Sequence, residues 1–403
     1  MLSAVRCGSF VTGRRVHAYS LLLLAGYLAA LAALLATSDG RLDYAGRPLG
    51  TDFINVYAAG KLANGGQAGL AYDWPAHHAV QKQTAGRADL PYAGWHYPPV
   101  FLLVAAALAL LPYLVALLVY QAVTLVLYLG VVQRIAGRRE AWLPALAFPA
   151  VFINITHGHN GFITAALLGG ALLVLDRRPL LAGCLIGGLS YKPQLAVLIP
   201  LVLAATGRWR VFGAAAATVA ATAVLALAVF GAGVFADFWA SLPLTRRVIL
   251  EGAPGFYKIQ SLYAALRLAG VPLALASAAQ TVLTIGLAIA LVALWRSAAS
   301  YELKAAALLI ACLLATPYVL DYDLVLLAPA MAFTAAHGLR RGFAPYELTA
   351  LAALWLLPLA ARPLAELTSV SLAPFVMLGA LWLIVQRAGM LHGAGTARGL
   401  RWR

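Results

Sequence analysis

The sequence predicts an all-α polytopic membrane protein built as one integral-membrane domain over residues 1–403. Of the 403 residues, 63% are hydrophobic and 11% are charged, and the mean hydropathy is +0.85. Few soluble chains could bury that much apolar surface. The basic residues give a formal net charge of +15, but most fall in short clusters between apolar runs. Clusters of this kind act as orientation signals in membrane proteins, so we expect no nucleic-acid partner.

Twelve apolar runs are the candidate membrane spans. The first follows Arg14-Arg15 and is long for the apolar core of a signal peptide, so we expect it to stay uncleaved. Several of the others are shorter than the roughly 20 residues that a straight span needs. The twelve runs are 17–37, 113–133, 141–157, 160–176, 179–191, 193–207, 210–231, 273–295, 301–318, 322–337, 346–361 and 369–387.

A thirteenth apolar run, 97–111, decides the topology. If it lies in the interface or re-enters, 18 of the 29 Lys and Arg residues fall in the cytoplasm, and the other 11 lie mostly in two long outer segments. The positive-inside rule is weak for long segments, so this arrangement satisfies it. We therefore predict twelve spans, cytoplasmic termini, a non-spanning helix at 97–111 and a basic cytoplasmic tail at 388–403.

Under this topology the polar segments gather on one outer face. They include a first extracytoplasmic loop with interfacial helices, 38–112, and a second large loop, 232–272. One elaborated face suits an enzyme that works at that surface of the plasma (inner) membrane. A transporter would more naturally show polar residues near the midplane and two related halves. A lipid or small-molecule transporter, a non-catalytic scaffold, and a ligase or phosphotransferase acting on polyprenyl carriers remain alternatives.

Asp52 follows the first span and is the candidate general base. Thr51 or Asp52 could cap the helix that comes next, which would make the carboxylate structural. A carboxylate at the membrane edge could instead take a proton from a reacting group.

Lys192 is the candidate anion ligand. A lysine in an apolar stretch is costly unless it pairs or reaches water, and Pro193 breaks the helix beside it. Lys192 could snorkel to the interface, or it could bind phosphate as a point charge. Cations of the second loop could join it or contact lipid headgroups; they are Arg246, Arg247 and Lys258.

Two short polar turns complete the pattern. His157-Gly158-His159-Asn160 could form a turn, contact a phosphate or sugar, or, less naturally, bind a metal, because its spacing is not specific for one. Asp321 and Asp323 flank Tyr322 and could cap the following span. We expect neither a metal nor another cofactor.

Taken in order, these segments resemble glycosyltransferase family 87, the mannosyltransferases of the GT-C fold that use polyprenyl-phosphate sugars. The resemblance covers about 50–340, and each motif is weak alone. The matching segments are Asp52-Phe53 with Tyr57 and Ala58, Tyr97-Pro98-Pro99, Gly158-His159-Asn160, Ala182-Gly183 through Lys192-Pro193-Gln194, Gln260-Ser261-Leu262, and more loosely Thr316-Pro317 to Tyr322.

The resemblance implies transfer of a hexose, mannose by family default, from a polyprenyl-phosphate-linked donor to a lipid or glycan acceptor, with inversion. It implies that Asp52 is catalytic. From the placement of the cations we expect the donor phosphate to be held by Lys192, with Arg246, Arg247 or Lys258. Relatives often have a histidine where this chain has Asp321 or Tyr322, so no imidazole role is assigned there. The implied substrate contacts are Tyr57, Tyr97, His159, Asn160, Gln194, Gln260, Asp321 and Tyr322.

Overall fold

The computed structural model describes residues 2–389 and is helical throughout, with only isolated β-bridges in that range. Short 3-10 segments (η) join or extend the α-helices. The first half of the chain holds α1 (Leu2–Cys7), α2 (Gly13–Ala36), α3 (Phe53–Asn64), η1 (Ala68–Tyr72), α4 (Trp74–Ala85), η2 (Pro99–Phe101), α5 (Leu102–Leu108), α6 (Tyr113–Ala136), η3 (Arg139–Ala141), α7 (Trp142–Leu146), α8 (Pro149–His157), α9 (Gly161–Val174), α10 (Pro179–Gly187) and η4 (Gly188–Tyr191).

The second half continues in the same style. It holds η5 (Pro193–Leu195), α11 (Ile199–Ala205), α12 (Trp209–Phe230), α13 (Gly233–Glu251), η6 (Phe256–Lys258), α14 (Leu262–Leu268), α15 (Leu273–Arg296), α16 (Tyr301–Leu314), η7 (Asp321–Leu326), α17 (Leu327–Arg341), α18 (Glu347–Thr368) and α19 (Ala373–Arg387).

The protein is a multi-pass membrane protein. Within residues 2–389, six helical stretches are long and apolar enough to cross a bilayer: α2, α6, α12, α15, α18 and the stretch formed by η7 and α17. Four shorter apolar stretches accompany them: Pro99–Leu108, Gly161–Val174, Pro179–Tyr191 and Ala373–Arg387. The expected count of twelve spans is not confirmed, although each of the twelve runs is largely helical. Some runs are broken; Pro149, for example, starts α8 and so divides the run 141–157.

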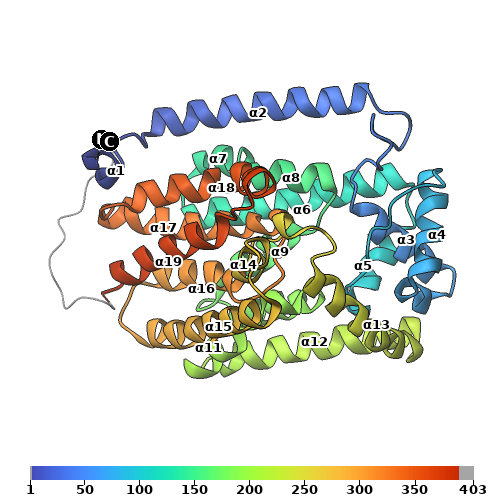
Figure 1. Cartoon of the computed structure of the whole chain (residues 1–403). Helices are drawn as coiled ribbons and strands as arrows, with labels where there is room; N and C mark the ends of the chain where they lie inside the picture. The colour runs from blue at the N-terminus through green and yellow to red at the C-terminus, as the bar shows by residue number, and fades with distance from the viewer. Residues whose placement is uncertain (1, 390–403) are drawn as a thin grey trace.

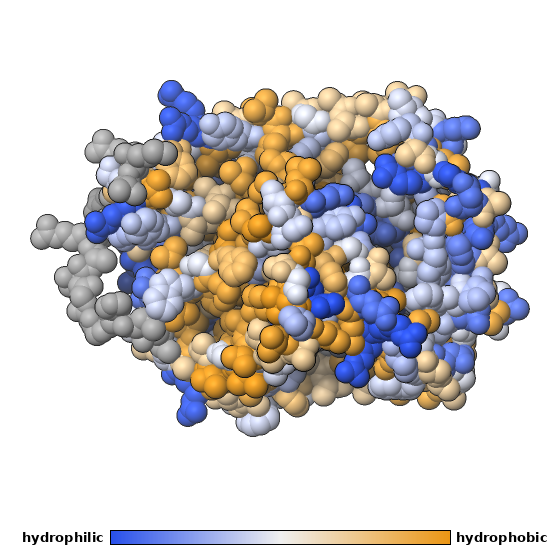
Figure 2. Space-filling model, viewed as in Figure 1, coloured by the Kyte–Doolittle hydropathy of each residue, from blue (hydrophilic) through white to orange (hydrophobic). Residues whose placement is uncertain are grey.

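An apolar belt crosses the middle of the molecule, with hydrophilic residues gathered toward both ends (Figure 2). At one end α1 meets α18, because the Arg6 carbonyl accepts the Tyr346 N–H, and α18 meets α19, because Arg387 lies 3.6 Å from Glu347. At the other end lie α3, α4, α5 and α13 (Figure 1). The first helix and the last helix therefore reach the same end of the bundle. Which compartment that end faces stays a prediction, and residues 390–403 of the basic tail lie outside the described range.

Helix α16 lies at the centre of the bundle. Its residues from Ala305 to Leu314 are all buried among other helices, within the predicted span 301–318. Small alanines on this helix allow α15, α17 and α19 to pack closely around it. The core thus surrounds the end of α16, where the chain enters the segment that carries Asp321–Leu326.

The run 97–111 packs against α3. Its helical part, Pro99–Leu108, is ten residues long and spans about 15 Å, roughly half of a bilayer core. A Cβ on Gly60 would lie 2.0 Å from the Ala105 carbonyl oxygen, so α3 and α5 touch through backbone. The Tyr57 hydroxyl donates to the Leu111 carbonyl at 2.9 Å. These contacts hold α3, which begins next to Asp52, against the segment 97–111.

Candidate active site

Asp52 sits at the N-cap position of α3, yet its side chain caps nothing. Its backbone N–H donates to the His157 carbonyl at 2.9 Å, which ties the start of α3 to the end of α8. The carboxylate Oδ2 lies 3.7 Å from Nδ1 of His157 and 3.8 Å from Nε2 of His159. About 40% of the Asp52 side chain is accessible. The capping interpretation is therefore wrong, and the carboxylate is available for chemistry.

The turn that brings the two histidines to Asp52 depends on Gly158. Its φ of +65° ends α8 in the left-handed region that favours glycine. A Cβ here would also lie 2.7 Å from the Cβ of Phe53 and 2.8 Å from the Leu117 side chain. Glycine is thus required twice, by backbone conformation and by the close approach of α3.

His159 is a buried, neutral imidazole. Its ring stacks on Tyr322 with centroids 3.2 Å apart, and its Nδ1 accepts the Asn160 backbone N–H at 3.0 Å. The other ring nitrogen, Nε2, faces Asp52. Burial lowers the pKa of His159 well below its usual value, and the positive charge of Lys192 lowers it further.

The surroundings of Asp52 favour its protonated form. Desolvation by the surrounding protein raises the pKa of the Asp52 carboxyl above its usual value, and the charge of Asp321 adds to this. His157, Lys258 and Arg362 oppose the rise. A carboxylate with a raised pKa is a stronger base than a solvated aspartate.

Lys192 is paired in the interior and does not snorkel. Its side chain is 3% exposed, and its Nζ lies 2.6 Å from Oδ1 of Asp323. The Nζ also lies 4.8 Å from the centre of the Tyr322 ring, so Tyr322 has Lys192 and His159 as direct neighbours. Asp323 accepts the Leu320 N–H through Oδ2 at 3.1 Å, as a capping residue would. From the sequence alone Asp323 is expected only to cap the next span, although a lysine in an apolar run signals a buried carboxylate partner.

Arg362 is a site cation that the sequence analysis missed. Its Nη1 lies 3.0 Å from Oδ2 of Asp321, and its guanidinium lies 6.0 Å from the Tyr257 ring centre. The side chain is 30% exposed, so it remains open to a ligand. A signal was present in the sequence, because Arg362-Pro363 at the end of an apolar run repeats the pattern of Lys192-Pro193.

Two predicted substrate contacts, Tyr97 and Asn160, are brought together in the wall of the site. The Asn160 Nδ2 donates to the Tyr97 hydroxyl at 2.7 Å. The Tyr97 ring packs near Phe101 and Tyr191, with centroid distances of 4.6 Å and 6.3 Å. An aromatic wall of this kind offers an apolar face and a polar tip to a ligand.

Asn154 holds the turn and Tyr322 together and was not foreseen. It is fully buried; its Oδ1 accepts the Gly161 N–H and its Nδ2 donates to the Tyr322 carbonyl, both at 2.9 Å. The only sequence signal is a lone asparagine inside an apolar run. Its amide fixes the distance between α9 and η7, and hence the stacking of His159 on Tyr322.

Four of the predicted site residues have other roles. The Tyr57 hydroxyl is engaged with Leu111, as described above. Gln260 is buried and donates to the carbonyls of Tyr257 and Lys258 at 3.3 and 3.0 Å, which shapes the η6 turn. Arg246 and Arg247 are exposed on α13, a 19-residue helix where a loop was expected. Arg247 lies 3.8 Å from Glu251.

The remaining two are closer to the expectation. Lys258 is half-buried, and its charge acts on Asp52. Gln194 is half-buried two residues after Lys192, and its side chain makes no hydrogen bond to other residues of the 2–389 range. Within that range, no group of three or more His, Cys, Asp or Glu residues is arranged to hold a metal.

The site therefore combines one accessible carboxylate, two imidazoles, and three cations within one neighbourhood. Comparison with known proteins gives a consistent answer. No curated protein and no solved structure matches the chain. The family model of glycosyltransferase family 87 matches residues 95–317, more than half of the 403 residues. The match includes the histidine turn, Lys192 and Lys258, and the chain belongs to glycosyltransferase family 87.

Proposed function

We propose that this protein transfers a hexose, with mannose as the first candidate, from a polyprenyl-phosphate-linked donor to a hydroxyl group of a lipid or glycan acceptor. Asp52 is the general base of the reaction. The observation that supports this most strongly is its carboxylate, which stands at a helix start without capping it and faces two imidazoles.

The proposed step is a single displacement. The acceptor hydroxyl loses its proton to Asp52 and its oxygen attacks the anomeric carbon. The new C–O bond forms as the bond from that carbon to the phosphate oxygen breaks, and polyprenyl phosphate leaves with the electron pair. Attack opposite the leaving group inverts the anomeric configuration. General-base assistance of this kind contributes about 10²–10⁴-fold.

The leaving phosphate needs positive charge where its own charge grows. We assign this role first to Lys258 and Arg362, because both act electrostatically on Asp52 and both keep part of their surface open. Lys192 adds positive potential from the interior, where it lies against the Tyr322 ring. Because Lys192 is paired with Asp323, only part of its charge acts on the phosphate. Arg362 donates to Asp321 as a single hydrogen bond, which leaves guanidinium N–H groups for a phosphate.

The membrane setting of the proposal rests on the arrangement of the helices. Long apolar helices support a cap of short ones around the site, which is the architecture expected of a GT-C enzyme (Figure 1). We place the site at the extracytoplasmic face of the plasma membrane because of the charge distribution of the loops. The polyprenyl chain would lie along the apolar segment 97–111, whose wall carries Tyr97.

The test is a product assay. Purified protein is incubated with a panel of polyprenyl-phosphate sugars and a membrane lipid extract, and the products are examined by mass spectrometry. The proposal predicts a glycolipid whose mass is greater by one hexose, formed with release of polyprenyl phosphate. Formation of no product with any hexose donor, while the donor binds, would contradict it.

A further inference from the structure

An apolar groove lies toward the opposite end of the molecule from Asp52. Helix α2 stands apart from the bundle in Figure 1, and of its 24 residues only Ser20 is buried. Between α2 and the bundle runs a groove of about 460 Å³, lined from Phe10 to Leu23 on one side and by α6, α7, α17 and α18 on the other. This volume falls within the roughly 300–1,000 Å³ typical of ligand sites.

The groove is separate from the candidate active site. One turn beyond its last lining residue on α2, Tyr27 stacks on Phe152 with ring centroids 4.6 Å apart. Phe152 lies on α8, which ends at His157 beside Asp52. The groove instead begins near Arg15 and Leu348, at the end of the bundle where α1 meets α18.

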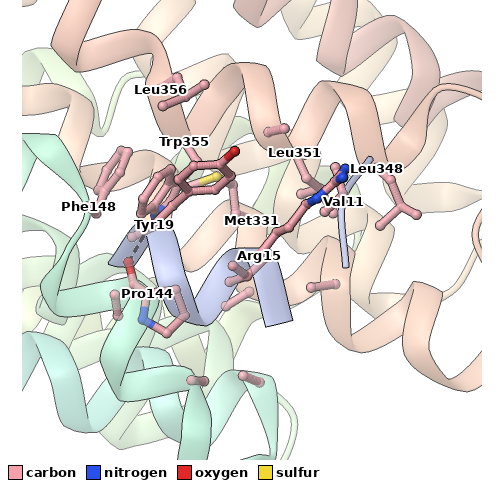
Figure 3. A pocket seen from close by; sticks show the side chains of 18 of the residues that line it. Val11, Arg15, Tyr19, Pro144, Phe148, Met331, Leu348, Leu351, Trp355 and Leu356 are labelled. Carbon is pink, nitrogen blue, oxygen red and sulfur yellow. Dashed lines mark hydrogen bonds between the residues drawn. The ribbon is translucent and has the colours of Figure 1, made fainter. Parts of the chain in front are cut away.

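The lining of the groove is apolar with one cation at its edge. Arg15 is the only charged residue among those that line it within the described range. Its Nη1 donates to the Phe10 carbonyl at 3.2 Å, and no carboxylate of residues 2–389 forms an ion pair with it. In Figure 3 the Arg15 side chain extends toward Leu348 and Leu351, whereas Tyr19 lies deeper, near Trp355 and Met331.

We propose that this groove binds an anionic phospholipid of the leaflet at the end of the bundle where α1 meets α18. One acyl chain fills the groove and the phosphate group pairs with Arg15. An empty groove in a bilayer would leave its lining atoms without contact partners, so hydrocarbon is the natural filling. The cation at the polar edge, with the apolar groove leading from it into the membrane belt, matches a headgroup followed by a chain.

The wall opposite α2 is held in place by the bundle itself. The Trp355 Nε1 donates to the Pro144 carbonyl at 2.9 Å, which links α18 to α7 across the floor of the groove. The groove is therefore shaped by protein contacts, which distinguishes it from an ordinary lipid-facing surface.

The test is lipid binding measured by native mass spectrometry on the detergent-purified full chain. The probes are dioleoyl phosphatidylglycerol and dioleoyl phosphatidylcholine. We expect phosphatidylglycerol to bind about fivefold more tightly, and Arg15→Gln to abolish this preference, because one basic residue near an anionic headgroup has an effect of that size. The matched control is Arg14→Gln, which removes a neighbouring cation that does not line the groove.

A second variant tests the acyl chain. Ala335→Phe fills the groove and should weaken the binding of both lipids, whereas Ala32→Phe on the exposed face of α2 should not. Thermal unfolding of each variant in detergent checks that it is folded. The assignment is overturned if Arg15→Gln and Arg14→Gln behave alike, or if folded Ala335→Phe binds as wild type does. If an equal concentration of polyprenyl phosphate displaced phosphatidylglycerol, the groove would be a binding site for the polyprenyl carrier and the phospholipid assignment would be overturned.

Discussion

The Nε2 atom of His159 faces the Oδ2 of Asp52 at 3.8 Å, while the other side of the same site holds Tyr322 flat against the His159 ring. This relationship joins the first polar segment of the chain to the last. It places the Asp52 carboxylate next to a neutral imidazole, and both next to the buried pair formed by Lys192 and Asp323. The account of function depends on this neighbourhood.

The pH dependence of transfer should report the raised pKa of Asp52. The carboxylate acts as a base only when deprotonated, so kcat/KM should fall as the pH drops through that pKa. Because burial raises the pKa of Asp52, the half-maximal pH should lie above the value of about 4 that an ordinary aspartate would give. The measurement is a pH profile of kcat/KM at saturating acceptor. A profile flat from neutral pH down to the ordinary aspartate range would remove Asp52 from the proton transfer.

The Lys192–Asp323 pair should behave as a buried ion pair. Lys192→Met leaves Asp323 charged, unpaired and buried, and should lower the free energy of unfolding by about 3–5 kcal/mol. Adding Asp323→Asn removes the stranded charge and keeps an oxygen for the Leu320 N–H, so stability should largely return. Thermal unfolding in detergent measures this.

Activity separates the two roles of that pair. If Lys192 contributes positive potential to the donor phosphate, the stable double variant should still show a raised donor KM. A double variant with wild-type kinetics would make the pair purely structural.

Arg362 should contribute to donor binding. Arg362→Gln removes a charge-assisted hydrogen-bond donor and should raise the donor KM by about tenfold or more. Arg246→Gln is the matched control, because that arginine is exposed on α13. Steady-state kinetics with varied donor measure both. Equal effects of the two substitutions would mean that Arg362 serves only to hold Asp321.

Gly158 should be needed for the approach of α3 as well as for its backbone conformation. Gly158→Ala places a Cβ 2.7 Å from Phe53, so it should destabilise the fold and displace His159 from Asp52. Gly207→Ala is the control, since its φ is +68° and nothing lies within 4 Å of the added carbon. The control should cost about 1–2 kcal/mol from the left-handed backbone alone, and Gly158→Ala should cost more. Similar losses in unfolding experiments would contradict the close packing at Gly158.

The helical membrane class was predictable from the sequence because composition and apolar run length set it directly. That 97–111 does not cross the membrane stays a prediction from the charge balance of the loops; the structure shows that its helix is short and packs against α3. The number of crossings was not predictable. Apolar runs such as 301–318 also serve as buried core, and hydropathy alone does not distinguish a helix that faces lipid from one that faces other helices.

The sequence motifs predicted which residues form the candidate site, but they did not predict which of these residues form ion pairs with one another. Asp52, His159, Lys192 and Tyr322 do come together, since sequence order and loop sidedness constrain where polar turns lie. The partners of the cations, Asp323 and Asp321, depend on how η7 packs, which no local pattern specifies. Gln260 and Tyr57 match family motifs, but their side chains donate hydrogen bonds to backbone carbonyls of neighbouring segments.

The most direct test of the account is Asp52→Asn in the transfer assay. The variant keeps the shape of the side chain and cannot accept the acceptor proton, so turnover should fall by about 10²-fold or more. Donor affinity should change little. The free energy of unfolding of the variant at neutral pH should equal or exceed that of the wild type. In the wild type, ionising a carboxyl whose pKa is raised by folding destabilises the folded state as the pH rises through that pKa, and the variant has no such carboxyl. A folded Asp52→Asn protein with near wild-type turnover would show that another group accepts the proton and would contradict the central claim.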